Sequence, residues 1–306
     1  MTDTQSTNEI LPGTPAWYDA RLSGIGGSDA AAAVGLHPYR TPLHVYAEKR
    51  GEIEPEPEND AMRLGKALEP VVVAEFVRRS GLQVRQRPVA LQRHPEWSWM
   101  LGTPDAILGD DELLEAKTGS RWAIADRFGD EDSDEVPEEY LIQCQHYLEL
   151  CGSPICHLAL LIDGRTLRTY RIERNERLIG HLIAAEEELW QRIADGRPPE
   201  PDWTHPRTGD LLRDLYDQAG ETRVELDEEA AEWLEEKERL GRQIREIKQR
   251  QEEVSNKLLA AVGDAGGGIL PGGDKELRKI AVAEKEIRYT RKPYVYLRKC
   301  NASDER

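Results

Sequence analysis

A short segment, residues 102–119, constrains the fold of this 306-residue chain more than any other. Two apolar runs lie on either side of a Gly-Asp-Asp turn, a pattern that predicts a β-hairpin. Because side chains alternate between the two faces of a strand, Glu115 and Lys117 are expected to share one face. Folding the hairpin about residue 110 places Asp105 opposite these two side chains.

Two carboxylates and a lysine at one place have a chemical implication. Asp105 and Glu115 repel each other unless a cation lies between them, and hard oxygen ligands of this kind suit a magnesium or manganese ion. A lysine such as Lys117 beside that ion orients a water molecule or stabilises charge that develops on a phosphate. An Asp, nine further residues and then Glu-x-Lys form the PD-(D/E)XK nuclease pattern. The alternative is a solvated hairpin face with surface charges.

A second candidate lies on a helix that is expected to have Asn59 or Asp60 as its N-cap and Gly81 as its end. Glu69 falls on the apolar stripe of this helix, where an unpaired carboxylate costs several kcal/mol. A metal ion would explain that position, and the alternative is a glutamate that reaches solvent at the helix edge. Pro70 is expected to bend the axis because it removes one hydrogen bond. The apolar stripe consists of Met62, Val72, Val73, Phe76 and Val77.

The segment between residues 17 and 32 combines an arginine with a glycine-rich turn. Ser28 or Asp29 is expected to cap a helix through the alanine run that follows. Glycines before a helix start leave backbone N–H groups exposed, which favours an anion, and Arg21 is placed to clamp a phosphate. The alternative is a plain capped helix with Arg21 on the surface.

A later helix is expected to begin with Pro137 at its first position and to continue to Leu150. Gln143 and Tyr147 lie one turn apart on it and therefore share a face. His146 is expected to be an ordinary histidine, satisfied at the surface or at the helix edge.

Strand patterns occur on both sides of that helix. Residues 82–94 alternate like a strand, and Pro88 indicates an edge position or a bulge. Residues 155–162 and 166–173 predict a second hairpin around an Asp-Gly turn, and the first run is apolar throughout, as in a central strand. The elements that follow are a helix over residues 175–194 and a proline-rich linker over residues 196–206.

The distribution of charge along the chain is compatible with a nucleic-acid partner. The formal net charge is -17, whereas nucleic-acid binders usually show a basic footprint. Residues 275–299, however, carry nine Lys or Arg against three Glu, so a local basic patch is compatible with the acidic total. The acids bunch in segments that are expected to be solvated loops or helix starts, at residues 52–60, 130–139 and 227–238.

The cysteines and the hydropathy pattern predict a soluble, cytoplasmic protein without membrane contact. Four cysteines in a chain of this length do not form a disulfide scaffold, and they are expected to be buried, reduced thiols. An iron–sulfur or zinc site is the alternative, but the sequence has no Cys-x-x-Cys. No leader-like segment and no bilayer-spanning apolar run are apparent. The cysteines are Cys144, Cys151, Cys156 and Cys300.

The last third of the chain, residues 207–306, is expected to be an appendage to a domain over residues 14–206 that follows a flexible segment, residues 1–13. A long helix is expected over residues 227–262 because Asp227 caps it and a glycine ends it. Residues 275–299 then form a basic, strand-like tail that either follows phosphates or forms a solvated edge. The helix has a coiled-coil seam, broken by Lys237 and Gln251, at Trp233, Leu240, Ile244, Ile247, Val254, Leu258 and Ala261.

Five motifs occur together in the order typical of one nuclease family. Through them, residues 17 to about 203 resemble the YqaJ-type viral recombinase family, relatives of the phage lambda exonuclease within the PD-(D/E)XK superfamily. Residues after 206 resemble only loosely a tail found in some members. The motifs are Arg21 with Ile25-Gly26-Gly27-Ser28-Asp29-Ala30, Gly65-Lys66-Ala67-Leu68-Glu69-Pro70, Thr103-Pro104-Asp105, Leu114-Glu115-Ala116-Lys117 and Gln143-Cys144-Gln145-His146-Tyr147.

The resemblance implies a catalytic metal centre. Asp105 and Glu115 would hold a magnesium ion, with manganese as a substitute, and the Ala116 backbone carbonyl would complete the shell. Glu69 would bind the ion directly or through water, or would hold a second ion. Lys117 would align the attacking water.

The resemblance also implies the rest of the site and the fold. Arg21 and Ser28 would receive the 5'-phosphate of the strand being cut, and Gln143 and Tyr147 would support the catalytic residues. The expected fold is α/β (α+β) and restriction-endonuclease-like, with a mixed central β-sheet flanked by helices.

The activity implied by this resemblance is Mg²⁺-dependent 5'-to-3' degradation of one strand at a linear duplex DNA end. It would leave a 3' overhang for a single-strand annealing protein in phage-type homologous recombination, in the cytoplasm of a bacterial host whose phage or prophage encodes the chain. A toroidal homotrimer is the assembly found in the family. The rival hypotheses are a structure-specific endonuclease and a non-catalytic DNA-binding or assembly module.

Overall fold

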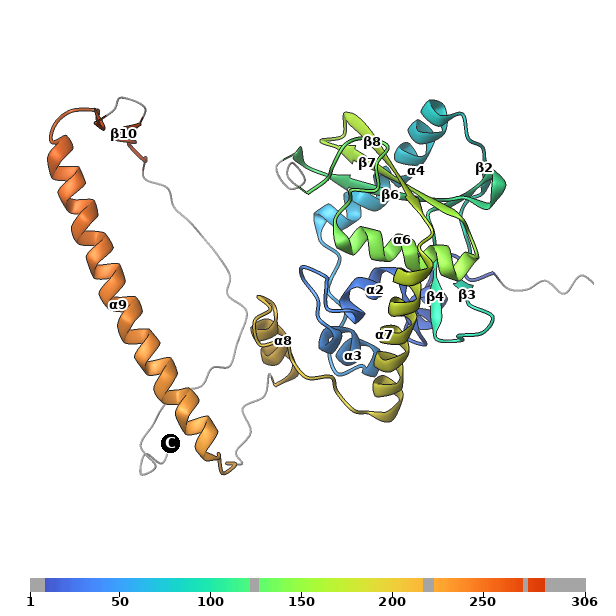
Figure 1. Cartoon of the computed structure of the whole chain (residues 1–306), viewed down its shortest axis with the longest axis horizontal. Coiled ribbons are helices and arrows are strands. Elements are labelled where there is room, and N and C mark those ends of the chain that lie inside the picture. The colour runs from blue at the N-terminus through green and yellow to red at the C-terminus, as the bar shows by residue number, and fades with distance from the viewer. Residues whose placement is uncertain (1–8, 122–126, 217–222, 272–274, 284–306) are drawn as a thin grey trace, which may run out of the picture. The chain divides into compact units, whose positions relative to one another are not determined.

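The computed structural model describes residues 9–121, 127–216, 223–271 and 275–283, in two compact units, Met1–Asp217 and Gln218–Arg306 (Figure 1). The first eight residues of the predicted flexible segment, and the predicted basic tail from residue 284 on, lie outside the described residues. The helices of the first unit are α1 Pro15–Arg21, α2 Gly27–Ala33, α3 Pro42–Arg50, α4 Asp60–Ser80, α6 Glu138–Cys151, α7 Glu176–Asp195 and α8 Thr208–Leu215. Its strands are β1 Ile25–Gly26, β2 Val84–Gln86, β3 Gln92–Arg93, β4 Met100–Gly102, β5 Ala106–Leu108, β6 Leu113–Gly119, β7 Ile155–Ile162 and β8 Thr166–Glu173.

A five-stranded mixed sheet with the order β2-β5-β6-β7-β8 forms the centre of the first unit. The pair β6–β7 is parallel and the other three pairs are antiparallel. The hairpin predicted for residues 102–119 is confirmed, because β5 and β6 pair across a short turn, Gly109–Asp111. The second predicted hairpin is also confirmed, with the predicted bounds of both strands.

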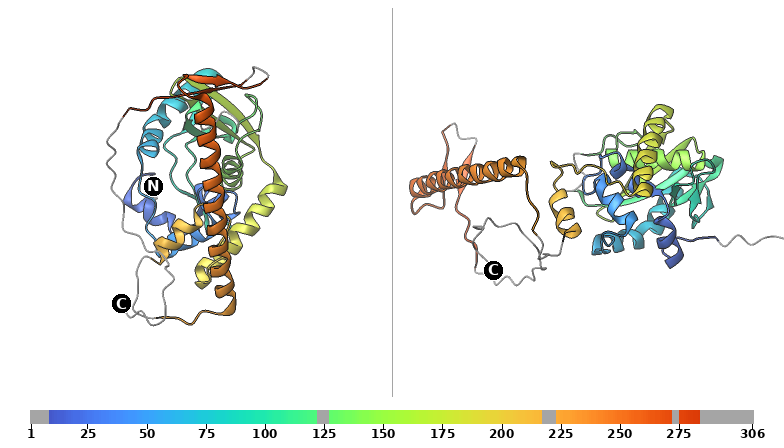
Figure 2. Two further views of the ribbon diagram at one scale, coloured as in Figure 1. Left: turned by 90° about the vertical axis from the view of Figure 1, so that its left-hand side faces the viewer. Right: turned by 90° about the horizontal axis from the view of Figure 1, so that it is seen from below.

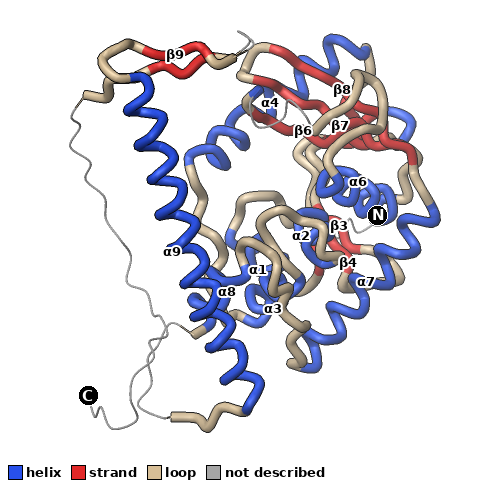
Figure 3. Tube along the Cα trace, turned by 60° about the vertical axis from the view of Figure 1, so that its left-hand side comes forward, coloured by secondary structure: helices blue, strands red, loops and turns tan. Residues whose placement is uncertain are grey.

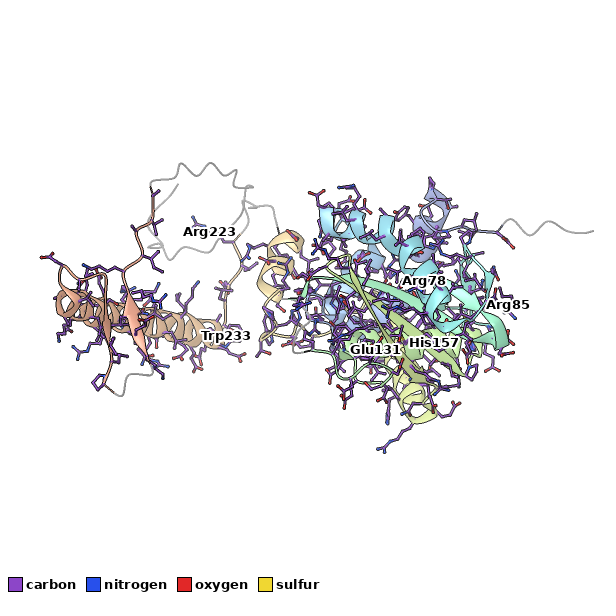
Figure 4. The ribbon with its side chains drawn as sticks, turned by 90° about the horizontal axis from the view of Figure 1, so that it is seen from above. Arg78, Arg85, Glu131, His157, Arg223 and Trp233 are labelled. Carbon is purple, nitrogen blue, oxygen red and sulfur yellow. The ribbon has the colours of Figure 1, made fainter. Side chains whose placement is uncertain are left out.

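Helices cover both faces of this sheet, as predicted. Alternate residues of β6 face the two layers, so that Leu114 packs with Val72 and Phe76 of α4. Leu113 belongs to the other core cluster, together with Leu148 of α6. Because the side-chain period of a strand is two, residues 115 and 117 face the α6 layer with Leu113. Figure 2 shows these layers from two further directions, and Figure 4 labels Arg78 on α4 and His157 on β7.

A smaller three-stranded sheet, with the order β1-β4-β3, lies on the other side of α6 from β6 and β7 (Figure 3). The single strand predicted for residues 82–94 is therefore wrong, since β2 joins the large sheet and β3 joins the small one. Pro88, which follows a cis peptide bond, has no N–H to donate, and a strand ladder does not continue through such a residue.

The helix predicted around Glu69 is confirmed as α4, with Asn59 as its N-cap and Gly81, at a φ of 75°, as its left-handed end. The helix continues through Pro70. Met62 departs from the predicted apolar stripe, since it is 44 % exposed. The apolar contacts of α4 with the sheet are made by its C-terminal half.

The prediction for His146 is wrong, because this side chain is fully buried. Its Nδ1 lies 2.8 Å from Glu186 Oε1 of α7, and its Nε2 lies 2.9 Å from the Leu101 carbonyl of β4. Burial opposes the charged form of the ring, but Glu186 outweighs it and raises the pKa of His146. The sequence shows that α7 is amphipathic but not that it packs over this face of α6.

The second unit contains α9, Glu228–Val262, and a small hairpin of β9, Gly267–Ile269, with β10, Glu276–Arg278. The predicted long helix is confirmed, and the Asp227 side chain caps it by accepting a hydrogen bond from the Ala230 N–H. No helix among the described residues has the length and apolar content needed to cross a bilayer.

The first unit extends past the predicted linker. Helix α8 follows residue 206, and its Leu211 is buried in the same core cluster as Leu189 of α7. The compact unit accordingly ends at Asp217, eleven residues after the predicted domain boundary.

The His146–Glu186 pair generates a prediction on stability. His146→Leu leaves a buried carboxylate without its partner and is expected to lower the free energy of unfolding by about 3–5 kcal/mol. The double variant His146→Leu/Glu186→Leu removes that carboxylate too, and should therefore be more stable than the single variant. Urea unfolding followed by circular dichroism measures both. A double variant no more stable than His146→Leu would contradict this assignment.

Candidate active site

A cavity of about 180 Å³ opens where the N-terminal segment, the small sheet, β6 and α6 meet. Six of the site residues predicted from the sequence line it, although they come from three separate parts of the chain. They are Arg21, Ser28, Asp105, Glu115, Gln143 and Tyr147.

The pairing register of the β5–β6 hairpin brings the carboxylates of Asp105 and Glu115 together. Asp105, the residue before β5, accepts a hydrogen bond from the Ala116 N–H at 2.7 Å. Burial, followed by the charges of Glu115 and Glu69, raises the pKa of Asp105 well above its usual range. The two acids therefore repel each other in a place that water reaches poorly.

Glu115 is buried, and its two oxygens differ in their surroundings. Oε1 accepts hydrogen bonds from Lys117 Nζ at 2.6 Å and Gln143 Nε2 at 2.7 Å, whereas the buried Oε2 has no hydrogen-bond partner among the described residues. Burial is the main cause that raises the pKa of Glu115. A buried carboxylate oxygen without a partner, next to a second carboxylate, fits a hard divalent cation.

Lys117 is held by three groups. Its Nζ donates to Glu115 Oε1 and also to Gln143 Oε1 at 3.0 Å, and it lies 5.2 Å from the centre of the Tyr140 ring. Burial alone would lower the pKa of Lys117, but Glu115 and Asp105 outweigh it and raise the pKa. Lys117 is therefore a fixed positive charge at neutral pH.

The side chains of α6 close the site from the opposite side. Gln143 and Tyr147 share a face as predicted, with Gln143 Nε2 and the Tyr147 hydroxyl 3.4 Å apart. The Tyr147 ring lies against two glycines, and a Cβ on Gly27 or Gly102 would come within 2.4 or 2.6 Å of a ring carbon. Only a residue without a side chain fits at these two positions.

Glu69 forms an ion pair with Arg87. Its Oε1 accepts a hydrogen bond from Arg87 Nη2 at 3.0 Å, and its side chain is 30 % exposed. Its charge still raises the pKa of both Asp105 and Glu115. Among the described residues, no three His, Cys, Asp or Glu side chains are arranged to share one ion. The role of Glu69 at a metal centre stays a prediction.

Arg21 and Ser28 lie together at the mouth of the cavity. Arg21 Nη2 donates to Ser28 Oγ at 2.8 Å, and its guanidinium carbon lies 4.9 Å from the centre of the Trp17 ring. Trp17 is fixed by its Nε1–H, which donates to Thr103 Oγ1 at 3.0 Å. Gly26 is the N-cap of α2, in place of the predicted Ser28 or Asp29, but Asp29 still caps the helix start because it accepts a hydrogen bond from the Gly26 N–H at 3.3 Å.

Asp29 is the site residue that the sequence revealed least. It is fully buried and accepts hydrogen bonds from Arg40 Nη1 at 2.8 Å and Lys49 Nζ at 2.7 Å, with Arg21 Nη2 at 3.8 Å. Burial opposes its ionisation, but Lys49, Arg40 and Arg21 outweigh it and hold the pKa of Asp29 well below its usual range. Lys49 Nζ also donates to the Arg21 carbonyl at 2.8 Å, so this network positions the Arg21 segment.

A mixed sheet whose hairpin places Asp105 and Glu115 in the lining of a cavity, with Lys117 hydrogen-bonded to Glu115, is the arrangement of the restriction-endonuclease-like PD-(D/E)XK class. Residues 16–154 match the model of the YqaJ-like viral recombinase domain. The uncharacterized protein YqaJ of Bacillus subtilis (strain 168) is 30 % identical over 259 residues, which is 83 % of this chain and 80 % of that protein. The chain therefore belongs to the YqaJ-like viral recombinase family. A match of that length extends beyond Met1–Asp217 and includes part of the second unit.

Solved structures agree with this fold. An alkaline exonuclease (LHK-Exo) from Laribacter hongkongensis superposes with a TM-score of 0.51 and 22 % identity, over 65 % of this chain and 100 % of that chain. The structure of LHK-Exo in complex with dAMP gives the same TM-score at 23 % identity, with the same coverage. At this identity the likeness establishes the fold.

The network around Asp29 generates a prediction on stability and pH. Asp29→Asn leaves Lys49 buried without its counter-charge, and we expect a loss of about 3–5 kcal/mol of unfolding free energy at pH 7. The pKa of Asp29 is lower in the folded protein than in the unfolded chain. Its contribution to the free energy of unfolding is therefore fully present above the unfolded pKa of about 4, and it is lost as the pH falls through the folded-state pKa.

Urea unfolding between pH 7 and pH 3 measures the difference in unfolding free energy between wild type and Asp29→Asn. It should stay constant down to about pH 4 and shrink only below that. Asp19→Asn, on an exposed residue of α1, is the matched control and should change little. A difference that already shrinks between pH 7 and pH 5 would contradict the assignment.

Proposed function

We propose that this chain is a Mg²⁺-dependent exonuclease that degrades one strand of a linear duplex DNA end in the 5'-to-3' direction and leaves a 3' overhang. The observation that carries the proposal is the buried, unpartnered Glu115 oxygen beside Asp105 and the charged Lys117. The family and the two alkaline exonuclease structures support a nuclease of the recombination type.

Asp105 and Glu115 would hold the divalent cation, with the Ala116 carbonyl as a further ligand and Glu69 acting directly or through water. When bound, the ion supplies Lewis-acid stabilisation of the charge that develops on the scissile phosphate. Its charge would also favour the ionised form of both acids, whose pKa values are raised mainly by burial. Glu69 is free to turn toward the site because its pair with Arg87 is partly exposed to solvent.

The remaining side chains have distinct tasks in this proposal. Lys117 donates a hydrogen bond that orients the attacking water, and its fixed positive charge stabilises the phosphate. Gln143 bridges Glu115 and Lys117, so it keeps the carboxylate and the ammonium in register. Tyr147 forms the wall of the cavity next to Gln143 and excludes water from that side.

Arg21 and Ser28 would bind the 5'-phosphate of the strand being cut. Both line the same cavity as the two acids, so a terminal phosphate held there places a nearby phosphodiester within reach of Asp105 and Glu115. This pocket favours a chain end over an internal site, which is the reason to propose an exonuclease. LHK-Exo, the solved structure of similar fold, binds dAMP.

The 3' overhang is the substrate that a single-strand annealing protein requires, and we propose such a protein as the partner in phage-type recombination. A homotrimer around the duplex would hold the DNA between successive cuts. A ring of this kind also lets an acidic exterior coexist with a basic inner surface.

A time course on linear duplex DNA, labelled at one 5' or one 3' end, tests the reaction directly. With Mg²⁺ the 5' label should be released first as a mononucleotide while the 3' label stays in long fragments, and a chelator should stop both. Lys117→Ala is expected to lower the rate by about 100-fold or more. Arg165→Ala, on an exposed turn, is the control that keeps the rate. Cleavage of closed circular duplex would favour an endonuclease instead.

The end-phosphate pocket is tested by substrates that differ in one group. Wild type should prefer 5'-phosphorylated over 5'-hydroxyl ends, and Arg21→Ala should lose that preference because it removes the guanidinium that pairs with the phosphate. Arg197→Ala, on an exposed arginine, should keep it. The ratio of initial rates on the two substrates is the measurement. An equal preference in wild type and Arg21→Ala would show that the pocket lies elsewhere.

A further inference from the structure

The long helix of the second unit has an apolar stripe that the other described residues of this unit leave uncovered. No residue of α9 is buried, and the large apolar side chains of the stripe are between 43 and 66 % exposed. Figure 4 labels the first of them, Trp233, on this helix. The others are Leu240, Ile244, Ile247, Val254 and Leu258.

The spacing of this stripe is that of a two-stranded coiled coil. With the polar Lys237 and Gln251 counted, the seam positions recur in alternating steps of three and four along α9, and Ala230 and Ala261 occupy the same seam at the two ends. A strict seam of this kind is narrower than the apolar face with which a helix packs on a globular core. An isolated helix gains little stability by itself, so the stripe requires a partner helix.

The charges of α9 favour a second copy of the same helix in the opposite direction. Residues 227–244 contain seven acids and three bases, whereas residues 245–262 contain four bases and three acids. Antiparallel pairing places the acidic half of each helix beside the basic half of the other. Parallel pairing places the two acidic halves together.

The polar seam positions favour the same direction. In a parallel pair in register, Lys237 meets the partner's Lys237 in one layer, so two buried charges repel each other. With Ile244 opposite the partner's Ile247, an antiparallel pair puts Lys237 beside Val254 of the partner, and its ammonium group can reach solvent from there.

The same antiparallel register matches the remaining layers. Trp233 lies opposite the partner's Leu258, Ala230 opposite the partner's Ala261, and Gln251 opposite the partner's Leu240. Glu236 and the partner's Lys257 then flank the seam with opposite charges. Both side chains now form exposed pairs within their own helix, with Arg239 and Glu253, and such pairs cost little to exchange.

We infer that α9 pairs with α9 of a second copy as an antiparallel two-stranded coiled coil. The contact is isologous, so it closes on two copies and does not propagate. With the proposed homotrimer, pairing of all three helices of one trimer with those of a second trimer gives six copies, and the pairing does not depend on the proposed nuclease activity.

The mass of the full-length protein in solution tests the pairing. Ile244→Glu/Ile247→Glu puts two charges into the seam and should halve the mass measured by light scattering after size-exclusion chromatography. Gln249→Glu/Asn256→Glu adds the same charges on the outer face and should keep the wild-type mass. Circular dichroism and urea unfolding check that the first unit stays folded. Equal masses for wild type and the seam variant would overturn the inference.

Cysteine cross-linking tests the direction. Two copies with tags of different size carry Leu240→Cys and Gln251→Cys, and the antiparallel pair should form the mixed disulfide at several times the yield of Leu240→Cys with itself. The parent chain with its native cysteines gives the background. A dominant Leu240→Cys self-pair would show a parallel coiled coil and overturn the inference.

Discussion

Repulsion between Asp105 and Glu115 is the constraint that the rest of the site has to satisfy. The hairpin register fixes both carboxylates in a place where burial raises the pKa of each. Lys117 and Gln143 compensate one oxygen of Glu115 and leave the other without a partner. A buried carboxylate oxygen in this state lowers the stability of the fold, and such destabilising groups cluster at functional sites.

Helix α6 connects this constraint to the rest of the first unit. Gln143 and Tyr147 face the acids from one side of the helix, and His146 on another side joins it to Glu186 of α7 and to β4. The N-terminal segment is held separately, by buried Asp29 and the three cations around it. The buried His146–Glu186 pair thus fixes the half of the cavity that carries the acids. The buried network around Asp29 fixes the half that carries Arg21.

Local patterns in the sequence were sufficient for the hairpins and for α4, α7 and α9, and with the family motifs they also gave six of the residues that line the cavity. The misassigned features depend on contacts between distant parts of the chain. His146 is buried by a helix 40 residues away, and Asp29 draws its cations from 11 and 20 residues further on. The strand around Pro88 is divided between two sheets, and no periodicity encodes which sheet receives each half. The predicted role of Glu69 at a metal centre stays a prediction, and its ion pair with Arg87 is a further contact that the sequence pattern did not reveal.

The short β5–β6 turn has a consequence for how the site assembles during folding. Asp105, Glu115 and Lys117 lie within 13 consecutive residues, so a single local closure brings them together at small entropic cost. Gln143, Arg21 and the Tyr147 wall arrive only through long-range docking. The like-charged pair and its ammonium partner therefore belong to one local unit, whereas the amide of Gln143 reaches Glu115 only once α6 has packed on the sheet.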